Sequence, residues 1–287
     1  SFWTADVDND GMKEVLFFMN RNSYYGDVAN NTDNKVWVLN VDGNESGALA
    51  DVVSYKITPD NLDGVTTVVE YDSGTYIGQG FHHASGGIPG IANFVSGTIT
   101  SDLTLSSGST GILTGSASTE FGTSAAFGDF NQDGVEEAVI GAPGDGGAIH
   151  VYDSAPSSFS GEADGVVEAD RSFTTNFNDK GLGWRMKAIG DINDDGHPEL
   201  LVSALGSGSD TGKVFVVDGL CLDGTTSNIN AASLFQITGE GAGDNFGWSI
   251  DSGDINGDGK ADVVIGAPYF ETTGPVMNGK VYVLLSE

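Results

Sequence analysis

The sequence predicts an all-β protein, a β-propeller in which small antiparallel sheets are repeated around a centre. Two observations lead to this prediction. A nine-residue acidic motif with glycine at its sixth position recurs along the chain, and short stretches rich in β-branched and aromatic residues follow it. A repeat of about 62 residues that holds three or four such strands and no convincing helix has the size of a propeller blade.

The clearest copy of the acidic motif is DINGDGKAD at residues 254–262. It places Asp254, Asn256 and Asp258 at positions 1, 3 and 5, a glycine at position 6 and a last carboxylate, Asp262, at position 9. Oxygen ligands at positions 1, 3 and 5, a backbone carbonyl at 7 and a glycine that permits a sharp turn are typical of a calcium loop. Carboxylates this close repel one another unless a cation lies among them. The motif therefore predicts calcium binding at the mouth of a buried strand.

Three further copies have the same spacing: DVDNDGMKE at 6–14, DFNQDGVEE at 129–137 and DINDDGHPE at 191–199. One copy would be ordinary turn material, but four predict four Ca²⁺ sites. The expected ligands are the side chains at positions 1, 3, 5 and 9 and the backbone carbonyl at position 7. They are Asp6, Asp8, Asp10, Met12 and Glu14; Asp129, Asn131, Asp133, Val135 and Glu137; Asp191, Asn193, Asp195, His197 and Glu199; and Asp254, Asn256, Asp258, Lys260 and Asp262.

The spacing of the loops predicts five repeat units in a single domain, residues 1–287. The last three loops begin about 62 residues apart, whereas the first two are about twice as far apart. We therefore expect a further unit between these two, with a degenerate loop at 59–67 in which Pro59 and Thr67 replace the first and last carboxylates. This unit is expected to fold as a blade without binding calcium.

Composition limits the classes of partner. With 41 acidic and 11 basic residues the net charge is −30, which argues against nucleic acid or an anionic membrane surface as a partner. The hydrophobic fraction of 39% is enough for a sizeable core. No apolar run approaches the roughly 18 residues of a membrane helix.

Composition also predicts the compartment. Cys221 is the only cysteine, so the chain has no internal disulfide and no Cys-rich zinc site. Weak calcium sites fill outside cells, which favours an extracellular or cell-surface location, with the periplasm as an alternative. No signal peptide is present, and the first residues are interpreted as a processed or trimmed start.

Further motifs recur in phase with the loops. Phe121-Gly122 and Phe246-Gly247 precede two loops, and the sequence GAP follows them at 141–143 and 266–268. With the DxNxDGxx[DE] loop between them, these units resemble the FG-GAP repeats of integrin α-subunit propellers and their bacterial, calcium-binding relatives. In another unit Leu182 replaces the Phe of FG and VSAL replaces GAP, as packing variants. The resemblance implies a ring of seven blades, so either five blades close the ring here or the chain is part of a larger propeller.

Other chemistry is less well supported. The chain has no HExxH zinc motif, no GxSxG nucleophile motif and no phosphate-binding loop. His82-His83 is interpreted as a loop or blade-edge pair, and the side chain of His197 as incidental to its loop. Packing is the expected role of the tryptophans, with a sugar-binding platform as the minority interpretation; they are Trp3, Trp37, Trp184 and Trp248.

The sequence thus predicts a secreted calcium-binding β-propeller with no catalytic residues. It is expected to act as an adhesion module that binds an extracellular protein or glycan, or as a subunit of an extracellular assembly. The alternative is a non-catalytic propeller domain of a secreted hydrolase. Similarity to integrin propellers implies that the calcium loops share one face and that partners dock on the other.

Overall fold

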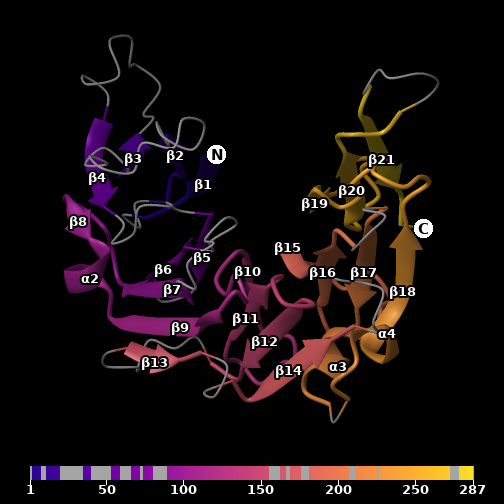
Figure 1. The fold of residues 1–287 in the computed structure, drawn as a ribbon, viewed down its shortest axis with the longest axis horizontal. Coiled ribbons are helices and arrows are strands. Elements are labelled where there is room, and N and C mark those ends of the chain that lie inside the picture. The colour runs from indigo at the N-terminus through magenta and orange to yellow at the C-terminus, as the bar shows by residue number, and fades with distance from the viewer. Residues whose placement is uncertain are drawn as a thin grey trace.

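The computed structural model describes residues 2–7, 11–19, 35–39, 53–58, 66–71, 74–79, 89–154, 162–165, 169–175, 181–206, 211–224, 226–271 and 278–286. These residues form five β-sheets that follow one another around an arc, as the blades of a β-propeller (Figure 1). The first strands of successive blades contact one another and lie on the inside of the arc. The all-β propeller of five repeat units predicted from the sequence is confirmed.

Each blade is an antiparallel sheet, and the first two blades each gain one parallel edge strand. The first blade contains β1 (Phe2–Ala5), β2 (Glu14–Met19), β3 (Lys35–Leu39), β4 (Val53–Thr58) and β8 (Leu103–Thr104). The second contains β5 (Thr67–Tyr71), β6 (Gly74–Gln79), β7 (Pro89–Ser96), β9 (Gly111–Ala117) and β13 (Glu162–Asp164). The third contains β10 (Ala125–Gly128), β11 (Glu137–Ala142), β12 (Ala148–Tyr152) and β14 (Arg171–Thr174).

The fourth blade contains β15 (Leu182–Ile189), β16 (Glu199–Ala204), β17 (Lys213–Val217) and β18 (Ser233–Thr238), and the fifth contains β19 (Ser249–Gly253), β20 (Asp262–Ala267) and β21 (Lys280–Leu284). Three helices of four residues each occur in the described part of the chain: α2 (Leu105–Gly108), α3 (Gly219–Leu222) and α4 (Ile229–Ala232). Within the described residues, none of the helices has the length and apolar character needed to cross a membrane.

The core is divided into four clusters, one between each pair of neighbouring blades. Leu16 and Val36 of the first blade, for example, pack with Ile77 of the second. Phe94 of the second blade packs with Ile140 of the third, and corresponding clusters join the third to the fourth and the fourth to the fifth. Successive side chains of a strand point to opposite faces of its sheet, and in a middle blade each face packs against a neighbouring blade. Both faces of a middle blade are therefore apolar.

The arc is open between its first and last blades. Figure 1 shows β1 and β19–β21 on opposite sides of the opening, so five blades do not close the ring in this structure. The outer face of β21 exposes Val281 and Val283 at 67% and 50%. Val214 and Val216, at the same positions of β17, are fully buried in the cluster between the fourth and fifth blades. The last blade thus exposes the apolar surface that the fourth blade buries against its successor.

The FG and GAP motifs interlock within a blade. The backbone N–H of Gly122 donates to the carbonyl oxygen of Gly141 at 2.9 Å, and Gly247 donates to Gly266 in the same way at 3.1 Å. Gly122 has φ +84°, and a Cβ there would lie 2.5 Å from the carbonyl oxygen of Ile91, so only glycine fits. The residue before this glycine anchors the turn in the core: Phe121, Phe246 and the variant Leu182 are all at most 1% exposed.

The second blade differs from the sequence-based expectation. In the other four blades, the acidic motif joins the first strand to the second. In the second blade only residues 72 and 73 separate β5 from β6, and Tyr71 pairs directly with Gly74. The motif at 59–67 ends at Thr67, which begins the first strand β5 and not the second strand, so it is not the counterpart of the metal loops; residues 59–65 lie outside the described residues. A loop is expected at 59–67 because the Asp-Gly pair at 63–64 fits the motif and because even spacing of the repeats places a loop there. The second blade does not keep that spacing.

Candidate metal centres and the adjoining cavity

The loop of the third blade wraps around its own carboxylates. The backbone N–H of Gly134 donates to Oδ2 of Asp129 at 3.0 Å, and Asp133 N–H donates to Oδ1 of Asn131 at 2.9 Å. Val135 N–H donates to Oδ1 of Asp133 at 2.9 Å. Gly134 has φ +91°, the left-handed conformation predicted for position 6. The side-chain oxygens at positions 1, 3 and 5 are thereby fixed on the inside of the turn.

Glu137, at position 9, completes this loop from the start of β11. It is 1% exposed, and its Oε2 accepts the backbone N–H groups of Phe130 at 2.8 Å and Asn131 at 3.2 Å. Its Oε1 and the Oδ1 of Asp129 are buried and have no hydrogen-bond partner. One carboxylate oxygen each from Asp129, Asp133 and Glu137 lie within 4.8 Å of one another. Buried, unpartnered carboxylate oxygens are costly, and a cation among them removes that cost.

The loop of the fourth blade repeats this arrangement. Gly196 N–H donates to Oδ2 of Asp191 at 2.8 Å, and Ile192 N–H donates to Oε2 of Glu199 at 2.7 Å. Glu199 is fully buried, and its Oε1 has no hydrogen-bond partner. Asp191, Asp195 and Glu199 again bring one oxygen each within 4.8 Å. The same geometry in two blades indicates that the carboxylate cluster is a regular feature of the repeat and not a chance group of acids.

Burial raises the pKa of both glutamates. The pKa of Glu137 rises to about 7 because it is buried, although N–H donation from Phe130 and Asn131 lowers it, and Asp133 and Asp129 raise it further. Burial likewise raises the pKa of Glu199 to about 7, with added repulsion from neighbouring carboxylates. A bound cation reverses this effect because it favours the ionised carboxylates. An all-oxygen donor set fits a hard cation such as Ca²⁺ better than zinc or copper.

The loop of the fifth blade differs at its last carboxylate. Oδ2 of Asp262 accepts the N–H of Ile255 at 2.8 Å, as in the other loops, but Oδ1 accepts the N–H of Ser286 at 2.9 Å. Burial raises the pKa of Asp262, but the N–H groups of Ser286, Ile255 and Asn256 outweigh it and the pKa is lowered. Both oxygens of this carboxylate therefore have protein partners. Asp254 still accepts the N–H of Gly259 at 2.8 Å, so the turn itself is the same.

The described part of the first loop has the same hydrogen bonds. Gly11 N–H donates to Oδ2 of Asp6, and Val7 N–H donates to Oε2 of Glu14, both at 2.9 Å. Asp8 and Asp10 lie outside the described residues, so their place in the predicted site stays a prediction.

Side chains at position 7 join neighbouring loops. His197 Nδ1 lies 2.9 Å from the carbonyl oxygen of Phe130 in the loop before it, and Lys260 Nζ lies 3.4 Å from Oδ2 of Asp194. The His197 side chain therefore makes a contact between blades that its interpretation as incidental to the loop did not include. Contacts between blades depend on packing, and the spacing within one repeat does not reveal them. The pair His82-His83 lies outside the described residues.

Two of the four tryptophans pack between the fourth and fifth blades. The rings of Trp184 and Trp248 are 5.0 Å apart, and Trp184 Nε1 donates to the carbonyl oxygen of Trp248 at 3.1 Å. Trp3 packs against the cluster between the first and second blades. These contacts agree with the predicted packing role, while the side chain of Trp37 lies outside the described residues.

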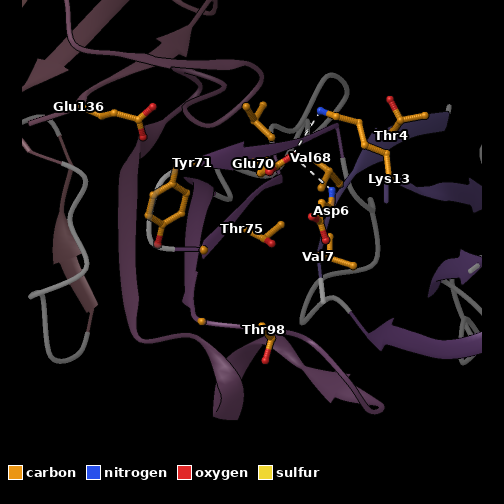
Figure 2. A pocket seen from close by; sticks show the side chains of 13 residues that line it. Thr4, Asp6, Val7, Lys13, Val68, Glu70, Tyr71, Thr75, Thr98 and Glu136 are labelled. Carbon is orange, nitrogen blue, oxygen red and sulfur yellow. Dashed lines mark hydrogen bonds and ion pairs between the residues drawn. The ribbon is translucent and has the colours of Figure 1, made fainter. Parts of the chain in front are cut away.

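A cavity of about 640 Å³ lies beside the loop of the first blade. Its lining includes Asp6 and Lys13 from that loop, Glu70 and Thr75 from the second blade, and Glu136 from the loop of the third (Figure 2). Glu70 joins two of the walls: its Oε2 accepts the Asp6 N–H at 3.2 Å and lies 3.3 Å from Lys13 Nζ. No sequence pattern predicted this cavity, because it forms where three blades meet.

Comparison with protein families matches two segments to the FG-GAP repeat. Residues 121–152 cover β10–β12 with the loop between them, and residues 246–284 cover the whole fifth blade. The chain is a β-propeller with FG-GAP repeats. The resemblance predicted from the FG, GAP and acidic-loop motifs is confirmed.

Curated relatives of this FG-GAP propeller fall into two groups. The chain is 32% identical over 169 residues to phosphatidylinositol-glycan-specific phospholipase D of Bos taurus, and the matched region covers 53% of this chain and 19% of that protein. It is 31% identical over 156 residues to integrin alpha-6 of Gallus gallus, covering 51% and 13%. With integrin alpha-PS2 of Drosophila melanogaster it shares 31% identity over 124 residues, covering 42% and 8%. The similar region therefore spans less than a fifth of each of these relatives.

Proposed function

We propose that this FG-GAP propeller is a secreted or cell-surface calcium-binding protein that acts as an adhesion module for an extracellular protein or glycan, or as a subunit of an extracellular assembly. The observation that carries the calcium part is the pair of carboxylate clusters with buried, unpartnered oxygens, one in the third blade and one in the fourth. Similarity to integrin alpha chains over about half of the chain supports the adhesion part.

The residues of each loop have distinct tasks in this proposal. Asp129, Asn131, Asp133 and Glu137 hold the ion through their side chains, and Val135 through its carbonyl oxygen; the same positions act in the other three loops. When bound, the ion supplies positive charge between the ends of the first and second strands. Backbone N–H groups orient the carboxylates, as Phe130 and Asn131 do for Glu137. The ion stabilises the loop face, and no reaction is assigned to it.

Similarity to a phospholipase D favours a second candidate, a non-catalytic propeller domain of a secreted hydrolase. The two candidates differ in what the chain does alone. An adhesion module retains its ligand by itself, whereas an accessory domain serves a catalytic domain elsewhere in its polypeptide.

A binding experiment tests the proposal. The purified chain is immobilised, and extracellular-matrix proteins and glycans are passed over it with calcium and after chelation by EDTA. We expect calcium-dependent retention of at least one of them, which is lost in the double variant Asp133→Ala/Asp195→Ala. Val135→Ala is the matched control, because position 7 contributes only its carbonyl. Retention that is equal in EDTA and in the double variant contradicts the calcium part, and failure to retain any matrix protein or glycan contradicts the adhesion part.

A further inference from the structure

The cavity exists because one blade lacks its loop. In four blades the nine-residue acidic motif lies where the first strand leads into the second, whereas Tyr71 and Gly74 of the second blade pair directly across a two-residue connection. The loops of the first and third blades therefore stand on either side of a gap in the row of loops. Lys13 and Glu136, both at position 8 of their loops, line the resulting cavity from its two sides (Figure 2).

The cavity is preformed by packed residues. Thr75 is 1% exposed, and Val7 and Val68 are 2% and 5% exposed. Tyr71 stacks on Phe127 of the third blade, with ring centres 5.0 Å apart. The volume of the cavity, about 640 Å³, lies within the range of small-molecule sites. A ligand that enters meets side chains already held in place, so little ordering opposes binding.

The lining is polar and mixed in hydrogen-bonding capacity. Hydroxyl groups come from Thr4, Thr75 and Thr98, and carboxylates from Glu70 and Glu136. Hydroxyl groups donate and accept, carboxylates only accept, and the Lys13 ammonium only donates. Val68 and Val69 supply a small apolar surface beside these groups.

Charge restricts the ligand. The carboxylates of Glu70 and Glu136 against the single ammonium of Lys13 disfavour an anion, and the third carboxylate, Asp6, is assigned to the metal loop. The Lys13 ammonium is 3.3 Å from Glu70, so these two charges largely offset each other. A neutral ligand with several hydroxyl groups can donate to the carboxylates and accept from Lys13 and the threonines, while its C–H groups contact the valines.

We propose that this cavity binds a neutral saccharide unit of a glycan. The inference rests on the proposed binding function and names its site. Glu136 accepts hydroxyl donors on one side, Lys13 and Glu70 bind on the other, and Thr75 contributes a fixed hydroxyl from β6. The ligand therefore lies on the face that carries the acidic loops, in the gap left by the second blade, whereas the similarity to integrin propellers implied docking on the opposite face.

Saturation-transfer NMR on the calcium-loaded chain tests this site. The probes are the methyl glycosides of glucose, mannose, galactose and fucose, with galacturonate and methylammonium as charged comparisons. Thr98 is exposed and lines the cavity, so Thr98→Trp fills the space without disturbing the core. Thr100→Trp is the matched control, because Thr100 is also exposed but lies outside the lining.

We expect saturation transfer to at least one neutral glycoside, its loss in Thr98→Trp and its retention in Thr100→Trp. Glu136→Gln should weaken binding on the order of tenfold, because a hydrogen bond to a charged acceptor is replaced by one to an amide. The inference is overturned if no neutral glycoside binds, if Thr98→Trp binds as well as wild type, or if galacturonate or methylammonium binds in preference.

The same variants separate this inference from the proposed function. If Thr98→Trp still retains the matrix protein or glycan that wild type retains, the adhesion function stands and the cavity is not its site. If wild type binds a methyl glycoside in this cavity but retains no matrix component, the saccharide site stands and the adhesion role fails.

Discussion

The imidazole of His197 in the fourth blade lies within hydrogen-bonding distance of the backbone carbonyl of Phe130 in the third, with 2.9 Å between Nδ1 and the oxygen. This contact ties two loops that each gather a carboxylate cluster. His197→Ala should lower the free energy of unfolding by about 1 kcal/mol, because one partly buried hydrogen bond is lost. Calcium affinity should not change, since position 7 supplies only its carbonyl.

Urea unfolding at saturating calcium measures the first effect, and calorimetric titration the second. Val135→Ala is the control, because Val135 occupies the same position and is 47% exposed. A tenfold loss of affinity in His197→Ala would show that the imidazole itself binds the ion.

The last carboxylates of the loops should respond oppositely to neutralisation when calcium is removed. Asp262 accepts N–H groups with both oxygens and its pKa is lowered, so Asp262→Asn should destabilise the metal-free protein in EDTA. Glu137 is buried with one unpartnered oxygen, so Glu137→Gln should leave the metal-free protein as stable or more stable at pH 8. Thermal unfolding of both variants in EDTA measures the two effects. Equal destabilisation of Asp262→Asn and Glu137→Gln would contradict the predicted difference between the two carboxylates.

The two raised pKa values predict how stability depends on pH. Glu137 and Glu199 have a pKa of about 7 in the folded chain, above the ordinary value of 4.5. Their contribution to stability is therefore complete below about pH 4.5 and is lost as pH rises through 7, by at most about 3 kcal/mol each. In EDTA, unfolding free energy should fall between pH 5 and 8, and the double variant Glu137→Gln/Glu199→Gln should fall less. With calcium the trend should reverse, because the ion binds the ionised form.

Sequence spacing predicted what is contained within one repeat. The positions of Asp129, Asn131, Asp133 and Glu137 in a turn closed by Gly134 follow from local backbone geometry, and so does the strand after each loop. The FG and GAP motifs predicted the blade because the backbone N–H of Gly122 donates to the carbonyl oxygen of Gly141 within the same repeat.

Contacts between repeats could not be predicted in this way. His197 and Phe130 are 67 residues apart, and the partner of Asp262 is Ser286, beyond the last strand. The cavity is a more distant consequence still. The cavity depends on the two-residue connection between Tyr71 and Gly74, where the other blades have an acidic loop. The motif at 59–67 led to the expectation of a degenerate loop at another place in this blade.

Two glycines with the same backbone conformation should differ in their tolerance of a side chain. Gly122 and Gly134 have φ of +84° and +91°. A Cβ on Gly134 meets nothing within 4 Å, so Gly134→Ala should cost only the left-handed strain, about 1–2 kcal/mol. A Cβ on Gly122 would lie 2.5 Å from the carbonyl oxygen of Ile91, so Gly122→Ala should cost at least about twice as much. Urea unfolding of the two variants gives the difference, and equal costs would show that the blades separate freely there.

Calcium should bind with a stoichiometry of four ions to five blades, and with unequal affinity. Between β5 and β6 the second blade has no acidic loop in which to hold an ion, because Tyr71 pairs directly with Gly74. In the fifth blade an ion competes with Ser286 for Oδ1 of Asp262, whereas Oε1 of Glu137 has no competing partner. The fifth loop should therefore bind more weakly than the third and fourth. A chain shortened to end at Leu285 loses both Ser286 donors, so its weakest site should tighten while the metal-free protein becomes less stable. Calorimetric titration measures the number and the affinities; a fifth ion, or an unchanged weakest site in the shortened chain, would contradict this account of the loops.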